Sequence, residues 1–138
     1  MMPQLNGVLE TALYVDDKVR SIAFFRDVMG LTILRDEERL TALDAGGGSV
    51  LLIFARGQST AGEDTPQGHI PGHDGAGPLH MAFKTAAEDY DAWRDQLRAH
   101  GVRELSEIHW PAGGRSVYFN DPDGHVLEIA TPGLWPNY

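Results

Sequence analysis

Short stretches in which hydrophobic and polar residues alternate recur along the chain, and this is the pattern of β-strands with one buried face. They span residues 8–15, 31–35, 40–43, 50–54, 79–83, 102–110, 115–120 and 125–130. Two further stretches place apolar residues at three- and four-residue steps, which predicts helices over residues 17–29 and 87–100. Gly30 and Gly101 suit the ends of these helices. The apolar face of the first helix is predicted to contain Val19, Ile22, Ala23, Phe25 and Met29.

Residues 56–77 interrupt this regularity. They are rich in glycine and proline and show no hydrophobic period, which is typical of a loop between two structured parts. The segment also carries His69 and His73. Its composition fits a simple connector, and it also fits a lid over a binding site, so the pattern leaves both interpretations open.

The two halves of the chain repeat one another. Each reads as strand, helix and three strands, so we expect one domain of two βαβββ modules, residues 6–55 and 78–132. Glu10 and Ala12 superpose on His80 and Ala82 at an offset of 70 residues. Matching positions near the end of each module follow at an offset of 76: Asp44 with Asn120, Gly48 with Gly124, Val50 with Val126, and Leu51 with Leu127.

Three residues with the chemistry of metal ligands occupy corresponding positions in this repeat. Glu128 lies in the middle of an apolar strand, where a carboxylate is costly unless it is paired, hydrogen-bonded or bound to a metal. If the modules face each other about a twofold axis, Glu10, Leu52, His80 and Glu128 point into one shared concavity. Carboxylates and an imidazole bind divalent metals. The alternative is an exposed strand glutamate and a core histidine.

Composition and charge narrow the class of protein. The chain has 138 residues, 42% of them hydrophobic, and no cysteine, so disulfides, zinc–thiolate sites and cysteine nucleophiles are excluded. Its formal charge of −9 argues against nucleic acid as a partner, because phosphate binding needs a basic surface. We find no signal peptide and no apolar stretch of membrane-spanning length, and therefore expect a soluble cytoplasmic protein with no membrane partner.

Three stretches, LETALYVDDKVRSIAFFRDVMGL, GPLHMAF and GGRSVYFNDPDGHVLEIATPG, resemble the vicinal oxygen chelate superfamily of glyoxalases, bleomycin-resistance proteins and dioxygenases. The resemblance implies an α+β fold of two paired βαβββ modules, a concave half-barrel pocket and a homodimer. It also implies metal ligands at Glu10, His80 and Glu128, with Leu52 where glyoxalases have a fourth. The pattern is similar to the fosfomycin-resistance branch, except that Glu10 replaces a histidine.

From this resemblance we expect a glyoxalase-like enzyme with one divalent ion per site, Mn, Ni, Zn, Mg or Fe(II), acting on a small substrate with vicinal oxygens. The ion would serve as a Lewis acid in isomerase, lyase or epoxide-opening chemistry, with Glu10 or Glu128 as the base. Candidates for the pocket wall are Ser116, Tyr118, Arg115 and Tyr14, with Trp110 or Trp135 as a cover.

Two alternative functions remain. One is a metal-free protein that sequesters a drug or metabolite, as the bleomycin-resistance branch does, and the acidic charge would suit a basic ligand. The other is an extradiol dioxygenase, which two carboxylates and one histidine make less favourable, because oxygen-activating Fe(II) sites typically have two histidines and one carboxylate.

Overall fold

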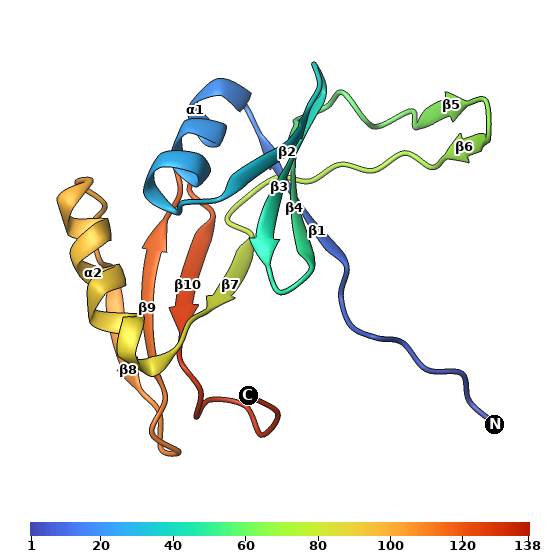
Figure 1. Ribbon diagram of the computed structural model, residues 1–138. Coiled ribbons are helices and arrows are strands. Elements are labelled where there is room, and N and C mark those ends of the chain that lie inside the picture. Colours follow the sequence, from blue (N-terminus) through green and yellow to red (C-terminus); the bar gives the residue numbers. More distant parts are fainter. The chain divides into compact units, whose positions relative to one another are not determined.

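The computed structural model describes all 138 residues and divides into two compact units, Met1–Ala76 and Gly77–Tyr138. Each unit contains one four-stranded mixed sheet, and neither sheet closes into a barrel (Figure 1). The predicted α+β class with two βαβββ modules is confirmed. None of the helices is long and apolar enough to cross a membrane.

The first unit is built around the sheet β1-β4-β3-β2. Its elements are β1 (Glu10–Val15), α1 (Lys18–Ala23), the π-helix η1 (Phe24–Val28), β2 (Thr32–Asp36), β3 (Leu40–Gly46) and β4 (Ser49–Ala55), followed by β5 (Glu63–Thr65) and β6 (Gly68–Ile70). Asp17 caps α1 by accepting a hydrogen bond from the backbone N–H of Arg20. The inner face of the sheet is fully buried at Leu43, Leu51 and Ile53.

Val19 does not belong to the apolar face of the first helix, contrary to our prediction, because its side chain is 82% exposed. Six residues at about 100° each place it roughly 120° around the helix axis from Phe25, which is fully buried. The change from α-helix to π-helix at Phe24 shifts the phase of the buried face further.

The segment predicted as a loop contains a short hairpin, β5 paired with β6 in antiparallel register. Each strand has only three residues and is largely polar and exposed, so the sequence shows no alternating pattern that would predict the hairpin. In Figure 1 the hairpin stands away from the sheet of the first unit at the end of two extended stretches.

The second unit repeats the design with the sheet β7-β10-β9-β8. Its elements are β7 (His80–Lys84), the 3₁₀ helix η2 (Ala87–Asp89), α2 (Tyr90–Ala99), β8 (Ser106–His109), β9 (Arg115–Asn120) and β10 (Val126–Ala130). In this unit α2 packs on β10, and Val117, Phe119 and Leu127 are fully buried. The predicted helix over 87–100 therefore begins as a 3₁₀ turn, and the strand predicted from residue 102 begins only at Ser106.

The registers of the two parallel strand pairs confirm the internal repeat. Glu10 pairs with Val50 in the first unit, as His80 pairs with Val126 in the second. Two residues along each strand, Ala12 pairs with Leu52 and Ala82 pairs with Glu128. Leu52 and Glu128 are thus structurally equivalent, as the offset of 76 residues indicated.

A buried contact between the side chains of Asp121 and His125 holds the turn that joins β9 to β10. Asp121 Oδ1 accepts hydrogen bonds from the backbone N–H groups of Asp123 and His125, and its Oδ2 lies 2.6 Å from His125 Nδ1. Both side chains of this pair are fully buried. Gly124 adopts φ +82°, which favours glycine. This turn sets the register that places Glu128 opposite Tyr118.

Candidate functional site

His80 and Glu128 form the polar centre of one sheet face in the second unit. Residues alternate between the faces of a strand, and the register puts His80, Glu128, Tyr118 and Ser116 on the same face. His80 Nε2 lies 3.3 Å from Glu128 Oε1. The Glu128 side chain is only 5% exposed, whereas that of His80 is 52% exposed and accessible to a ligand.

The hydrogen bond on the far side of the imidazole defines what His80 presents to Glu128. His80 Nδ1 lies 2.7 Å from the backbone carbonyl oxygen of Val126. A carbonyl oxygen can only accept, so Nδ1 carries the proton and a neutral His80 turns the lone pair of Nε2 toward Glu128. An ionised carboxylate is also only an acceptor. The pair is therefore favourable only with a proton or a metal cation between the two atoms.

The second carboxylate oxygen of Glu128 is held by a hydroxyl. Ser116 Oγ donates to Glu128 Oε2 at 2.5 Å, and Trp110 Nε1 donates to Ser116 Oγ at 2.8 Å. Ser116 is fully buried. The predicted pocket residue Ser116 thus lies at the site, with its hydroxyl proton directed to Glu128.

Tyr118 lies beside both candidate ligands. Its ring stacks against the His80 imidazole with centroids 6.1 Å apart and an interplanar angle of 27°. Burial raises the pKa of Tyr118, and the charge and hydrogen bonding of the Glu128 carboxylate raise it further. The phenol therefore stays protonated near neutral pH, with its O–H engaged by the Glu128 carboxylate.

Arg115 lies on the opposite face of the same sheet, so the structure does not support its predicted place in the pocket wall. Its guanidinium donates to Glu107 at 2.9 Å and to Asp91 at 3.2 Å, and it stacks 4.2 Å from the centre of the Tyr90 ring. The reason is strand alternation, because neighbouring residues such as Arg115 and Ser116 point to opposite faces. The sequence alone contained this signal.

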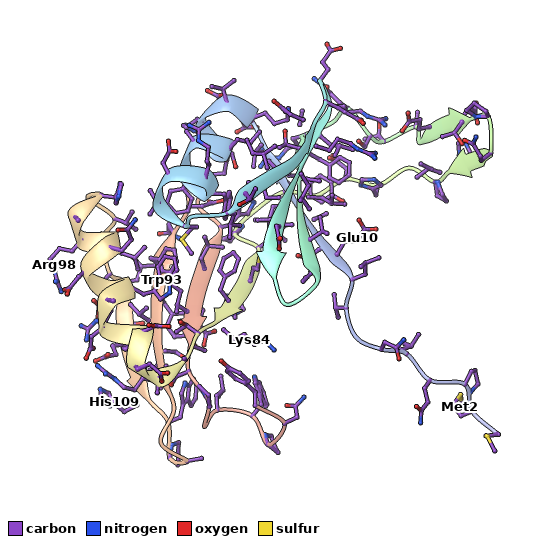
Figure 2. The ribbon with its side chains drawn as sticks, viewed as in Figure 1. Met2, Glu10, Lys84, Trp93, Arg98 and His109 are labelled. Carbon is purple, nitrogen blue, oxygen red and sulfur yellow. The ribbon has the colours of Figure 1, made fainter.

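In the first unit, Glu10 begins β1 where the N-terminal segment leads away, and it is exposed (Figure 2). Tyr14 shares its sheet face, as Ala12 does. Tyr14 is 9% exposed and its hydroxyl lies 2.7 Å from His73 Nδ1.

Trp135 of the second unit, one of the two residues predicted to cover the pocket, is 66% exposed.

His73 is anchored on the sheet of the first unit, which sequence reasoning missed. Its ring contacts Phe54 edge-on, with centroids 4.5 Å apart, in addition to the bond to Tyr14. Two residues later, a Cβ at Gly75 would lie 2.5 Å from the Tyr14 ring, so the chain can pass this close only with glycine there. His69, by contrast, pairs with Asp64 within the exposed hairpin.

Neither unit by itself gathers three or more histidine, aspartate or glutamate side chains in the way a complete metal site does. Within the second unit, the structure brings together His80, Glu128, Ser116 and Tyr118. This set contains two potential ligands and the groups that surround them.

The sequence model of the Glyoxalase/Bleomycin resistance protein/Dioxygenase superfamily matches residues 7–129, and the chain belongs to this family. A crystal structure of lactoylglutathione lyase from Agrobacterium tumefaciens is similar, with a TM-score of 0.88, 31% identity, and coverage of 97% of this chain and 99% of that one. Metallothiol transferase FosB of Staphylococcus haemolyticus is 27% identical over 131 residues, or 94% of this chain and 86% of the relative. Glutathione transferase FosA of Serratia marcescens is 29% identical over 134 residues, or 97% and 84%.

Proposed function

We propose that this protein is a divalent-metal-dependent, glyoxalase-like enzyme acting on a small substrate with neighbouring oxygen atoms. Glu10, His80 and Glu128 are the proposed metal ligands. The observation that carries the proposal is the contact between His80 Nε2 and Glu128 Oε1 at 3.3 Å, with His80 Nδ1 already used by Val126. Membership of the glyoxalase family and relatives named as enzymes support it.

The residues present fit a metal ion. Two donor atoms bonded to one ion at about 2.1 Å lie roughly 3.0–3.4 Å apart when they occupy neighbouring coordination positions. The separation of His80 Nε2 and Glu128 Oε1 falls in this range. One imidazole and carboxylate oxygens suit Mn, Ni, Zn, Mg or Fe(II). The hydrogen bond from His80 Nδ1 to a backbone carbonyl is the usual support of a metal-binding histidine.

A bound divalent ion supplies Lewis acidity to the oxygens of a substrate. The protein residues supply the remaining functions. Glu10 or Glu128 accepts a proton from the substrate, and Glu10 is the freer of the two, because Ser116 occupies one oxygen of Glu128. Tyr118, with its raised pKa, donates a hydrogen bond. Tyr14 remains our candidate for the pocket wall in the first unit.

We further propose that the substrate or its partner is a thiol. The three relatives are named as a metallothiol transferase, a glutathione transferase and a lactoylglutathione lyase; the first two names refer to a thiol and the third to a thioester of glutathione. The chemistry would be addition of a thiol to an epoxide or isomerisation of a thiol adduct of an α-ketoaldehyde. We propose a homodimer, which light scattering would test, and a cytoplasmic location.

Metal binding is the first test. Metal-depleted protein is re-equilibrated with Mn(II), Ni(II), Zn(II) and Fe(II), and bound metal is measured by elemental analysis for the native chain, His80→Ala and His109→Ala. His109 is the matched control, because it lies in the same unit on the opposite face of the sheet. We expect one ion per chain, lost in His80→Ala and kept in His109→Ala. The loaded protein is then screened with α-ketoaldehydes or epoxides in the presence of glutathione, and with catechols.

Absence of stoichiometric binding in the native chain would overturn the proposal. The sequestering function of the bleomycin-resistance type would then be preferred, and thermal-shift screening with cationic drugs would be the next experiment. Turnover of catechols in place of thiols would support the dioxygenase alternative.

A further inference from the structure

A chain of three side chains, Trp110, Ser116 and Glu128, ends at the proposed metal ligand. An indole N–H can only donate, so Trp110 donates to Ser116 Oγ at 2.8 Å. An ionised carboxylate can only accept, so the Ser116 hydroxyl donates to Glu128 Oε2 at 2.5 Å. The direction of both hydrogen bonds is therefore determined, and a hydroxyl that accepts from one neighbour donates more strongly to the next.

This chain of hydrogen bonds acts on only one of the two carboxylate oxygens of Glu128. Oε2 is held by Ser116, while Oε1 faces His80 Nε2 at 3.3 Å. A carboxylate fixed in this way offers one oxygen to a cation and cannot rotate to offer both. Glu128 is 4% exposed and Ser116 is fully buried, so water does not replace this restraint.

We propose that Trp110 and Ser116 are positioning residues that hold Glu128 as a one-oxygen ligand. This inference rests on the proposed function and deepens it, because it assigns to Ser116 and Trp110 a role different from contacting or covering the substrate. The Ser116 hydroxyl uses its proton for Glu128 and one lone pair for Trp110. A substrate would have to displace one of these two buried bonds to reach it.

Removing the hydroxyl should weaken metal binding. Ser116→Ala leaves Trp110 Nε1 without its acceptor and releases Glu128 Oε2, so the carboxylate can turn and chelate with both oxygens. Loss of such a supporting hydrogen bond typically lowers metal affinity about ten- to a hundredfold. Trp110→Phe keeps an aromatic ring and the Ser116 hydroxyl but removes the indole N–H, so its effect should be smaller. Ser116→Thr retains the hydroxyl and should restore affinity.

The hydrogen-bond chain is tested first in metal-free protein by NMR of the indole N–H groups. The protein contains three tryptophans, and the indole N–H signal that is missing in Trp110→Phe is that of Trp110. We expect the Trp110 N–H to exchange slowly with solvent in the native chain, to shift and exchange faster in Ser116→Ala, and to be unchanged in Ser116→Thr. The exposed Trp135 provides the matched control variant, Trp135→Phe.

Affinity is then measured by Mn(II) titration, and geometry by the Co(II) absorption spectrum. We expect Mn(II) affinity at least tenfold weaker in Ser116→Ala, several-fold weaker in Trp110→Phe, and near native in Ser116→Thr and Trp135→Phe. The Co(II) spectrum of Ser116→Ala should change with the coordination of Glu128.

If Ser116→Ala binds Mn(II) within twofold of the native chain, the positioning role is wrong and the proposed function stands. If the native chain binds no metal, both fall. If Ser116→Thr is folded and shows a native Trp110 signal but does not restore Mn(II) affinity, the hydroxyl does not position Glu128. A tenfold loss in Ser116→Ala with an unchanged Co(II) spectrum and indole signal would likewise overturn the positioning role.

Discussion

Replacing Glu128 with glutamine should move stability and metal affinity in opposite directions. In metal-free protein at pH 8, a neutral His80 presents a lone pair to Glu128 Oε1 at 3.3 Å, so two acceptors face each other. The amide of Glu128→Gln can donate its N–H to His80 Nε2 while its oxygen accepts from Ser116. The variant thus satisfies both neighbours without a buried charge.

The magnitude follows from burial and from the number of hydrogen bonds. A buried carboxylate carries a desolvation cost of several kcal/mol, which the hydrogen bonds from Ser116 and Tyr118 offset only in part. A new neutral hydrogen bond contributes about 1 kcal/mol. We therefore expect the metal-free variant to be more stable by about 1–3 kcal/mol, which corresponds to a Tm increase of roughly 3 °C or more. Metal affinity should fall at least about tenfold, or ~1.4 kcal/mol.

The assay is chemical denaturation and thermal unfolding of both proteins in the presence of a chelator, together with Mn(II) titration. Glu88→Gln is the control, because Glu88 lies exposed in η2, and its stability should change by less than about 0.5 kcal/mol.

A metal-free Glu128→Gln protein that is less stable than the native chain at pH 8 would refute this reasoning. It would mean that Glu128 is stabilised in the absence of any cation. Unchanged Mn(II) affinity would remove Glu128 from the set of ligands.

Two further predictions concern other parts of the chain. Gly75→Ala should force the Tyr14 ring or residues 73–75 to move. We expect it to destabilise the protein by about 1–3 kcal/mol and to speed proteolysis within residues 56–76. Tyr14→Phe removes only the bond to His73, and unchanged cleavage in Gly75→Ala would contradict this placement. Desolvation alone would raise the pKa of Glu107, but hydrogen bonds from Tyr90, His109 and Arg115 and the charge of Arg94 lower it overall from 4.5. Its contribution to stability is therefore complete above about pH 4.5 and lost as pH falls through the lowered pKa. Denaturation across pH 2–6 should show a weaker pH dependence for Glu107→Gln, and equal slopes would show that the Glu107 carboxylate is not linked to folding.

Much of the architecture could be predicted from the sequence, because strands and helices leave local periods in the chain. The alternation around Glu128 and the offsets of 70 and 76 residues gave the repeat that the strand registers confirm. Gly30 could also be predicted as a helix end, since a positive φ restricts the residue type at one position. Val19 was misplaced because six residues of an ordinary α-helix already put it roughly 120° from Phe25, and the π-helix that begins at Phe24 shifts the buried face further.

The candidate site was only partly predictable, since contacts between distant residues have no local signature. Alternation by itself puts Ser116 and Arg115 on opposite faces, but only packing shows that Arg115 is held by Glu107 and Asp91. The docking of His73 on Tyr14 crosses 59 residues, and the hydrogen bonds from Trp110 through Ser116 to Glu128 join the end of β8 to β9 and β10.

The sequence by itself determined the class of fold, the repeat and the residue types able to bind a metal, because these depend on period and side-chain chemistry. The tertiary structure decided which atoms of those side chains are free. His80 Nδ1 is bound to Val126 and Glu128 Oε2 is bound to Ser116, so only Nε2 and Oε1 face each other. Hydrogen-bond direction arises from the register of neighbouring strands, and register is a property of the folded sheet rather than of any one stretch of sequence.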